Sequence, residues 1–122
     1  MKAGKVSQKR VLVVEDEAEV REAIRRLLSA DRHTVVEAAN GIEGLDLFTR
    51  EKFDLVIVNF HLPGMMGDKL IARIKQMVPG QPVILITAFG ETLGSLEIRA
   101  DYFLDKPFGI EALREAVAKL LS

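Results

Sequence analysis

The sequence contains no cysteine and no tryptophan among its 122 residues. The lack of cysteine excludes disulfide scaffolds, cysteine-ligated zinc and thiol nucleophiles, and it is typical of proteins from a reducing compartment. No apolar run approaches the roughly 18 residues of a membrane span, and the first ten residues lack the apolar core of a signal peptide. We therefore expect a cytoplasmic protein with no membrane partner.

An excess of charge of one sign is also missing. The chain has 17 basic and 18 acidic residues and a net charge of −1, so it lacks the basic field that binds nucleic acid. Residues 1–10 hold four basic residues and no acid, which leaves residues 11–122 with a net charge of −5. We interpret residues 1–9 as a flexible tail or linker remnant and residues 10–122 as one domain, because the chain is too short for two domains of ordinary size.

Five short apolar runs, rich in β-branched residues, are typical of strands buried on both faces. These runs are Val11–Val14, Thr34–Ala38, Leu55–Val58, Val83–Ile86 and Tyr102–Leu104. Stretches with helical spacing follow each of them: Val20–Leu28, Ile42–Phe48, Leu70–Val78, Glu91–Ile98 and Ile110–Leu121. The alternation predicts an α/β, doubly wound (βα)5 flavodoxin-like fold with a five-stranded parallel sheet, strand order 2-1-3-4-5 and helices on both faces.

Local signals define some of the element ends. Asn40 is a candidate cap for the second helix, and Pro79-Gly80 is expected to stop the third. Gly90 and Gly94 lower the helix propensity of Glu91–Ile98, which we expect to be the most mobile helix. Pro63-Gly64 and Gly67 predict a tight loop after the third strand.

Polar residues stand where the predicted strands end. The first strand leads into Glu15 and Asp16, the third into Asn59, the fourth into Thr87 and the fifth into Asp105-Lys106-Pro107. Parallel strands end at one edge of the sheet, so these groups should meet there. Carboxylate and amide oxygens suit Mg²⁺, and a hydroxyl beside an ammonium group complements a phosphoryl group. The sequence carries no glycine-rich nucleotide loop, and its two distant histidines argue against a zinc site.

Each of these residues also has a purely structural explanation. The acidic pair can stabilise the start of a helix, Thr87 can simply end a strand, and Lys106 can be a solvated lysine. We prefer the site interpretation because the charged groups converge on the edge where doubly wound sheets bind ligands.

Four segments resemble the receiver (CheY-like) domain of two-component response regulators: Val11–Glu17, Asp54–Gly67, Ile86–Ala88 and Asp105–Phe108. The resemblance covers residues 10–121. It implies that Asp16 is a direct Mg²⁺ ligand and that Glu15 acts through water. It places Asn59 at the position of the phospho-accepting aspartate, and it implies that the backbone carbonyl of His61 completes the metal shell.

The resemblance implies further roles on the other side of the site. Thr87 matches the switch hydroxyl, Lys106 matches the phosphate-contacting lysine, and Phe103 matches an aromatic switch position. Phe103 is equally well explained as plain core, and Tyr102 as packing on the opposite face. The bond between Lys106 and Pro107 is expected to be cis.

Asn59 departs from the family pattern. A neutral amide is a very poor nucleophile, so this chain should not accept a phosphoryl group at position 59, and with one carboxylate fewer it should bind Mg²⁺ weakly. Asn59 is either an engineered replacement of aspartate or a mark of a natural pseudo-receiver.

The leading hypothesis is a non-enzymatic signalling receiver in a phosphorelay. Its partner would be a sensor histidine kinase or a phosphotransfer protein, and its output would pass to an effector domain or downstream protein through the predicted fourth helix, fifth strand and fifth helix. The alternative is a protein-interaction module that works without phosphorylation. A Mg²⁺-dependent phosphohydrolase is disfavoured, because position 59 offers no carboxylate nucleophile and 122 residues leave no room for a cap domain.

Overall fold

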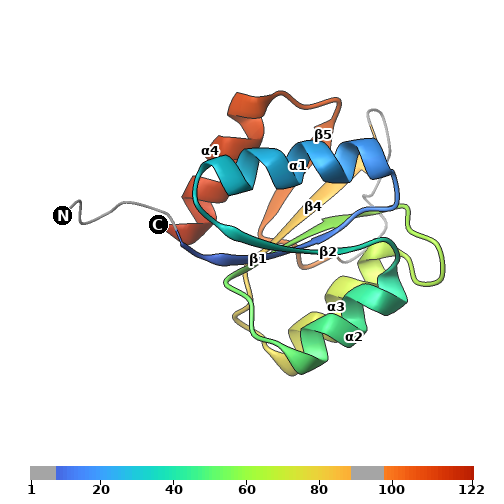
Figure 1. The fold of residues 1–122 in the computed structure, drawn as a ribbon. Coiled ribbons are helices and arrows are strands. Elements are labelled where there is room, and N and C mark those ends of the chain that lie inside the picture. The colour runs from blue at the N-terminus through green and yellow to red at the C-terminus, as the bar shows by residue number, and fades with distance from the viewer. Residues whose placement is uncertain (1–7, 89–97) are drawn as a thin grey trace.

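A parallel five-stranded sheet lies between two layers of helices in the computed structural model, which describes residues 8–88 and 98–122 (Figure 1). The elements are β1 (Arg10–Val14), α1 (Ala18–Ala30), β2 (Thr34–Ala38), α2 (Gly41–Arg50), β3 (Leu55–Asn59), α3 (Gly67–Met77), β4 (Val83–Ala88), β5 (Tyr102–Lys106) and α4 (Ile110–Leu121). The strand order is β2-β1-β3-β4-β5, with all pairs parallel. This confirms the predicted doubly wound, flavodoxin-like fold. Most of the predicted helix Glu91–Ile98 lies outside the described residues, so its expected mobility stays a prediction.

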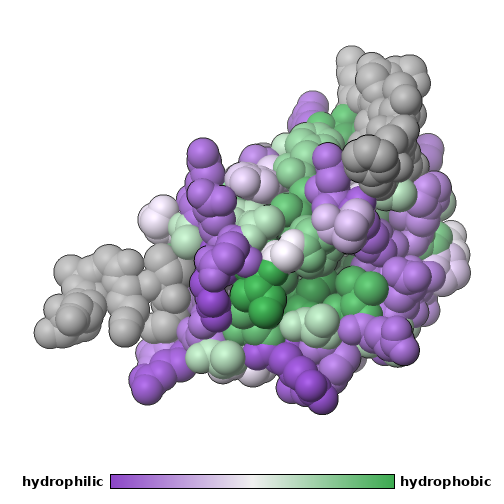
Figure 2. Space-filling model, turned by 90° about the horizontal axis from the view of Figure 1, so that it is seen from above, coloured by the Kyte–Doolittle hydropathy of each residue, from purple (hydrophilic) through white to green (hydrophobic). Residues whose placement is uncertain are grey.

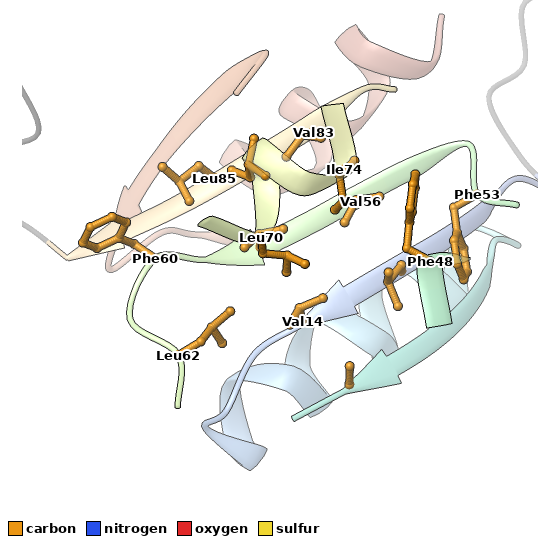
Figure 3. Close-up of a cluster of buried hydrophobic side chains, with 14 residues drawn as sticks. Val14, Phe48, Phe53, Val56, Phe60, Leu62, Leu70, Ile74, Val83 and Leu85 are labelled. Atoms are coloured by element: carbon orange, nitrogen blue, oxygen red, sulfur yellow. The ribbon is translucent and has the colours of Figure 1, made fainter. Parts of the chain in front are cut away.

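Consecutive strand residues point to opposite sides of the sheet, and helices cover each side. The central strands are therefore buried on both faces. Leu12 and Val56 pack beneath α2 and α3, whereas Val13 and Ile57 pack against α1 and α4. Figure 3 shows the first of these layers, with side chains from α2 and α3 directed onto the central strands. Close packing on both faces of the central strands fixes the relative positions of their ends.

The helix ends follow the local signals. Asn40 caps α2: its side-chain oxygen accepts a hydrogen bond of 2.7 Å from the backbone N–H of Glu43, which confirms the predicted cap. The third helix ends at Met77, just before Pro79-Gly80, as predicted. Among the described residues, no helix is both long and apolar enough to cross a membrane.

Three strands run further toward their carboxyl ends than predicted. Asn59, Thr87 and Lys106 belong to β3, β4 and β5 themselves rather than to the loops that follow. The hydrogen-bonded register therefore positions these candidate site residues directly, with Asn59 beside Ile86 and Thr87 beside Asp105.

A buried lysine stabilises the amino-terminal ends of β4 and β5, on the side of the sheet away from the candidate site residues. Lys75 of α3 is 7% exposed, and its Nζ donates to the backbone oxygen of Gln81 at 2.6 Å and to Asp101 Oδ2 at 2.9 Å. The same carboxylate oxygen accepts the backbone N–H of Val83 at 2.8 Å. Asp101 thus joins α3 to the first residues of both β4 and β5, a contact that sequence reasoning missed.

Replacing Asp101 by alanine is expected to lower the free energy of unfolding by about 2–3 kcal/mol, because it leaves a buried ammonium group without its counter-ion. Asp101→Asn keeps an acceptor for the Val83 N–H and should cost less. Lys75→Met removes the buried charge itself and should be the mildest of the three. Urea unfolding of the three variants measures this order, and an Asp101→Ala protein as stable as Lys75→Met would contradict it.

His33, just before β2, makes the stability depend on pH. The side chain is buried, and its Nδ1 accepts the backbone N–H of Lys9 at 3.3 Å. Burial lowers the pKa of His33, with help from Lys9, against the opposing carboxylates of Asp31 and Asp54. The folded state therefore binds a proton less readily than the unfolded chain, so stability is highest above the ordinary histidine pKa of about 6.5 and falls as the pH drops through it.

Urea unfolding at pH values from about 7.5 down to about 5.5 is expected to show this decline. A His33→Asn variant, which retains a side-chain acceptor for the Lys9 N–H, should show a flatter profile over the same range. Identical profiles for the two proteins would assign the pH dependence to other groups.

Candidate functional site

The predicted site residues meet at the carboxyl edge of the sheet. The acidic segment Glu15–Glu17 follows β1, and Asn59, Thr87 and Lys106 lie at the ends of the three strands beyond it. Three side-chain contacts join this acidic segment to β3 and β5: Asn59 Nδ2 lies 3.3 Å from Asp16 Oδ1, and Lys106 Nζ lies 3.4 Å from Glu15 Oε1 and 3.0 Å from Glu17 Oε1. Residues up to 89 positions apart in sequence thus form one cluster.

Asn59 is at the centre of the cluster and is only 5% exposed. Its Nδ2 donates to the backbone oxygen of His61 at 2.8 Å and to Asp16 Oδ1 at 3.3 Å. Both partners are acceptors, so the nitrogen of the amide, and not its oxygen, faces them. The side chain therefore links the segment after β1 to the loop after β3.

Glu15 is the most deeply buried charged residue of the site, with no exposed surface. Its Oε2 accepts the backbone N–H of Glu17 at 3.0 Å, while Oε1 is within ion-pair distance of Lys106 but lacks hydrogen-bond geometry. Burial raises the pKa of Glu15, and the Glu17 N–H and the Lys106 cation only partly oppose this. The carboxylate depends on Lys106 for its charge balance.

Lys106 lies between two acids. Its Nζ donates to Glu17 Oε1 at 3.0 Å in addition to its contact with Glu15. Burial alone would lower the pKa of Lys106, but the hydrogen bond to Glu17 and the charges of Glu15 and Glu17 outweigh it and raise the pKa. Lys106 is therefore a stable cation, and its bond to Pro107 is cis, as expected. Sequence reasoning assigned no role to Glu17, although it directly follows the acidic pair.

Thr87 and Phe103 differ in their surroundings. Thr87 is buried, and its hydroxyl donates to Asp105 Oδ1 at 2.9 Å on the neighbouring strand. Phe103 is 49% exposed, so the interpretation of this residue as plain core is wrong. It lies on the edge strand β5, on the face opposite Tyr102 and Leu104, and within residues 8–88 and 98–122 β4 is the one strand beside it. Tyr102 packs against the layer under α1 and α4, as expected.

The loop after β3 is held closely by backbone contacts. Gly64 adopts φ +81°, the left-handed conformation that favours glycine. The N–H of Gly67 donates to the oxygen of Phe60 at 2.7 Å, and the N–H of Phe60 donates to the oxygen of Ile86 at 2.8 Å. The predicted tight loop is confirmed, and it places the His61 carbonyl beside Asn59.

The oxygen groups at this edge are of the kind that Mg²⁺ prefers, but their arrangement does not fit the ion. The atom that Asn59 turns toward Asp16 and the His61 carbonyl is a hydrogen-bond donor, which cannot be a ligand. In the part of the chain that the structure describes, no three His, Asp or Glu side chains are grouped as metal ligands.

An apolar groove of about 550 Å³ adjoins Lys106, between α1 and the start of α4. Figure 2 views the side of the molecule that carries these two helices and shows hydrophobic side chains surrounded by hydrophilic ones. Ile110 is 62% exposed here, although its helical spacing suggested a buried face. The groove is lined by Val20, Ala23, Ile24, Leu27, Pro107, Phe108, Ile110 and Leu113, with Lys106 and Glu19 among its polar members. The candidate site therefore has an apolar surface beside it.

Residues 11–118 match the Response regulator receiver domain family, and the chain belongs to this family. It is 34% identical over 115 residues to Sporulation initiation phosphotransferase F of Bacillus subtilis, a match that covers 92% of this chain and 93% of that protein. It is 33% identical to Response regulator MprA of a Mycobacterium species, over 92% of this chain and 50% of that protein. The chain thus spans half the length of the second relative.

Solved structures agree with this membership. Response regulator protein TrrA from Thermotoga maritima, in complex with Mg²⁺-BeF, has a TM-score of 0.86 and 34% identity over 93% of this chain and 99% of that one. A CheY-like receiver domain protein from Methanospirillum hungatei has a TM-score of 0.87 and 29% identity, with 94% of each chain covered.

Proposed function

We propose that this chain is a phosphorelay receiver module, formed by residues 10–122, in which position 59 is the phospho-acceptor position and asparagine keeps it unphosphorylated. One observation carries the proposal. Asn59 ends the central strand β3, is buried, and lies against Asp16 at the edge where Lys106 and Thr87 also end their strands. This is the position from which a carboxylate would have an acid and a cation close by.

The chemistry of position 59 decides the state of the module. Transfer of a phosphoryl group to a receiver forms a bond between phosphorus and a carboxylate oxygen, and the donor's leaving group departs with its electron pair. The amide of Asn59 has no anionic oxygen, so no such bond forms. We assign Lys106 and Thr87 to contacts with the phosphoryl oxygens, and Thr87 and Phe103 to the switch. The donor would be a sensor histidine kinase or a phosphotransfer protein.

A second candidate is a protein-interaction module that works without phosphorylation. It is favoured by three hydrogen bonds that the site residues already make with one another: Asn59 with Asp16, Lys106 with Glu17, and Thr87 with Asp105. The exposed Phe103 on β5 and the neighbouring α4 then belong to the surface through which an effector would bind, while most of the predicted fourth helix lies outside the described residues.

Intact mass after incubation with Mg²⁺ and acetyl phosphate tests the proposal on this chain and on an Asn59→Asp variant. A gain of one phosphoryl group by the variant alone supports a receiver that is blocked at one side chain. No gain by either protein overturns the proposal and favours the interaction module.

A further inference from the structure

We propose that the amide of Asn59 replaces the divalent cation, and not only the acceptor carboxylate, so that the site of this chain holds its form without Mg²⁺. The inference rests on the proposed function in one respect, the assignment of this edge as the receiver's phosphorylation site. The carrying observation is that Nδ2 of Asn59 joins Asp16 Oδ1 and the His61 carbonyl oxygen, at 3.3 and 2.8 Å.

The orientation of the amide follows from the chemistry of its neighbours. A carboxylate oxygen and a carbonyl oxygen both accept hydrogen bonds, and the two N–H groups of the amide supply one donor for each. Turning the amide over would bring a third acceptor oxygen against these two and would leave the N–H groups without them. Like a cation, the N–H₂ group offers partial positive charge to two oxygens at once.

A cation at this place would compete with the amide for the same atoms. The ligands that the resemblance implies for an ion, the Asp16 carboxylate and the His61 carbonyl, both already accept hydrogen bonds from Asn59. Asn59 is 5% exposed, so little water is at hand to compensate N–H groups that lose their partners. Ion binding therefore has to overcome the loss of two partly buried hydrogen bonds, which weakens it.

The segment that carries His61 is also fixed by contacts that involve no ion. The backbone N–H of Phe60 donates a hydrogen bond to the oxygen of Ile86 at 2.8 Å, and the oxygen of Phe60 accepts one from the N–H of Gly67 at 2.7 Å. The His61 carbonyl is therefore in place before any ligand arrives. With aspartate at position 59, the same geometry would bring a third carboxylate to Glu15 and Asp16, and that protein would need a cation to relieve the repulsion.

The side-chain amide of Asn59 can be observed directly by ¹⁵N-correlated NMR, because the sequence has only two asparagines and three glutamines. The Asn59→Asp variant identifies the resonance pair by its disappearance, and the Asn40 pair is the internal reference. We expect the Asn59 pair to exchange with water more slowly than the Asn40 pair and to keep its chemical shifts from excess EDTA to millimolar Mg²⁺. A saturable shift of the Asn59 pair on adding Mg²⁺ would overturn the proposal.

Thermal unfolding at constant ionic strength gives an independent measure. The unfolding midpoint of this chain should be the same in EDTA and in millimolar Mg²⁺, whereas the Asn59→Asp variant should have a lower midpoint in EDTA and recover with Mg²⁺. An Asn40→Asp variant of this chain adds the same charge at a different position, and its unfolding midpoint should not depend on Mg²⁺.

If the unfolding midpoints of this chain and of Asn59→Asp both respond to Mg²⁺, or if neither responds, the proposal that the amide replaces the cation is overturned. These results are separable from the proposed function, because phosphoryl uptake by Asn59→Asp is read from mass. Phosphoryl uptake by that variant together with a Mg²⁺ response of the unaltered Asn59 chain would refute this inference alone.

Discussion

An Asn59→Asp variant is expected to take up a single phosphoryl group from acetyl phosphate, whereas an Asn40→Asp variant is expected to take up none. Both changes add one carboxylate, so the comparison isolates the surroundings of position 59. There, Asp16 lies 3.3 Å from the side chain, and Thr87 and Lys106 lie at the carboxyl ends of β4 and β5 on the same side of the sheet. Position 40 is a helix cap, which aspartate fills as well as asparagine does, so the control should fold normally.

Removing Lys106 from the Asn59→Asp variant should show how much the lysine charge contributes to phosphoryl uptake once the nucleophile is present. We expect Lys106→Ala, combined with Asn59→Asp, to slow phosphoryl uptake by about 10²-fold, the usual cost of losing one preorganised charge contact. The rate is measured as the increase of the phosphorylated mass with time. An unchanged rate for the double variant would show that Lys106 takes no part in the reaction.

Equal labelling of Asn40→Asp and Asn59→Asp would show that acetyl phosphate reacts with carboxylates outside the candidate site as well.

Replacing Gly67 by alanine is expected to lower the free energy of unfolding by about 3 kcal/mol. An added Cβ would lie 2.5 Å from the backbone oxygen of Asn59 and 2.8 Å from Cα of Phe60. Both are main-chain atoms at the end of β3, so no flexible side chain can move aside. Relief requires α3 to shift away from the sheet, which would also displace the loop that carries the His61 carbonyl.

Gly80→Ala is the matched control, because an added Cβ at Gly80 would meet no atom within 4 Å. Its effect on stability should stay within about 0.5 kcal/mol. Urea unfolding compares the two variants, and side-chain NMR of Asn59 in Gly67→Ala reports whether the site moves with the helix. If both glycine variants unfold at the same urea concentration, the close approach of α3 to β3 is not what stabilises this end of the sheet.

The architecture was predictable because the apolar patterns of the strands are local. Runs such as Leu55–Val58 show burial on both faces by their composition, and the alternation with helices leaves few topologies. The convergence of Asp16, Asn59 and Lys106 on one edge follows from the direction of parallel strands. These parts of the prediction required no knowledge of individual side-chain contacts.

The pairing of side chains was not predictable in the same way. Lys106 binds Glu17 across 89 positions of sequence, and Lys75 binds Asp101 across 26, contacts that depend on register and side-chain conformation rather than on composition. The orientation of the Asn59 amide depends on a backbone oxygen, which no residue type reveals. The exposure of Phe103 follows from its edge strand, which the strand order defines and local hydrophobicity does not.

Lys106 belongs to two surfaces at once, since it pairs with Glu17 in the site and also lines the apolar groove between α1 and α4. A protein that fills this groove takes water away from the ion pair and so changes the effective dielectric in which Lys106, Glu15 and Glu17 interact. If a partner bound there, linkage would require that the factor by which it changes the proton or ion affinity of the site equal the factor by which that proton or ion changes the partner's affinity. Through Lys106, binding in the groove would thus be coupled to the charge state of the carboxyl edge.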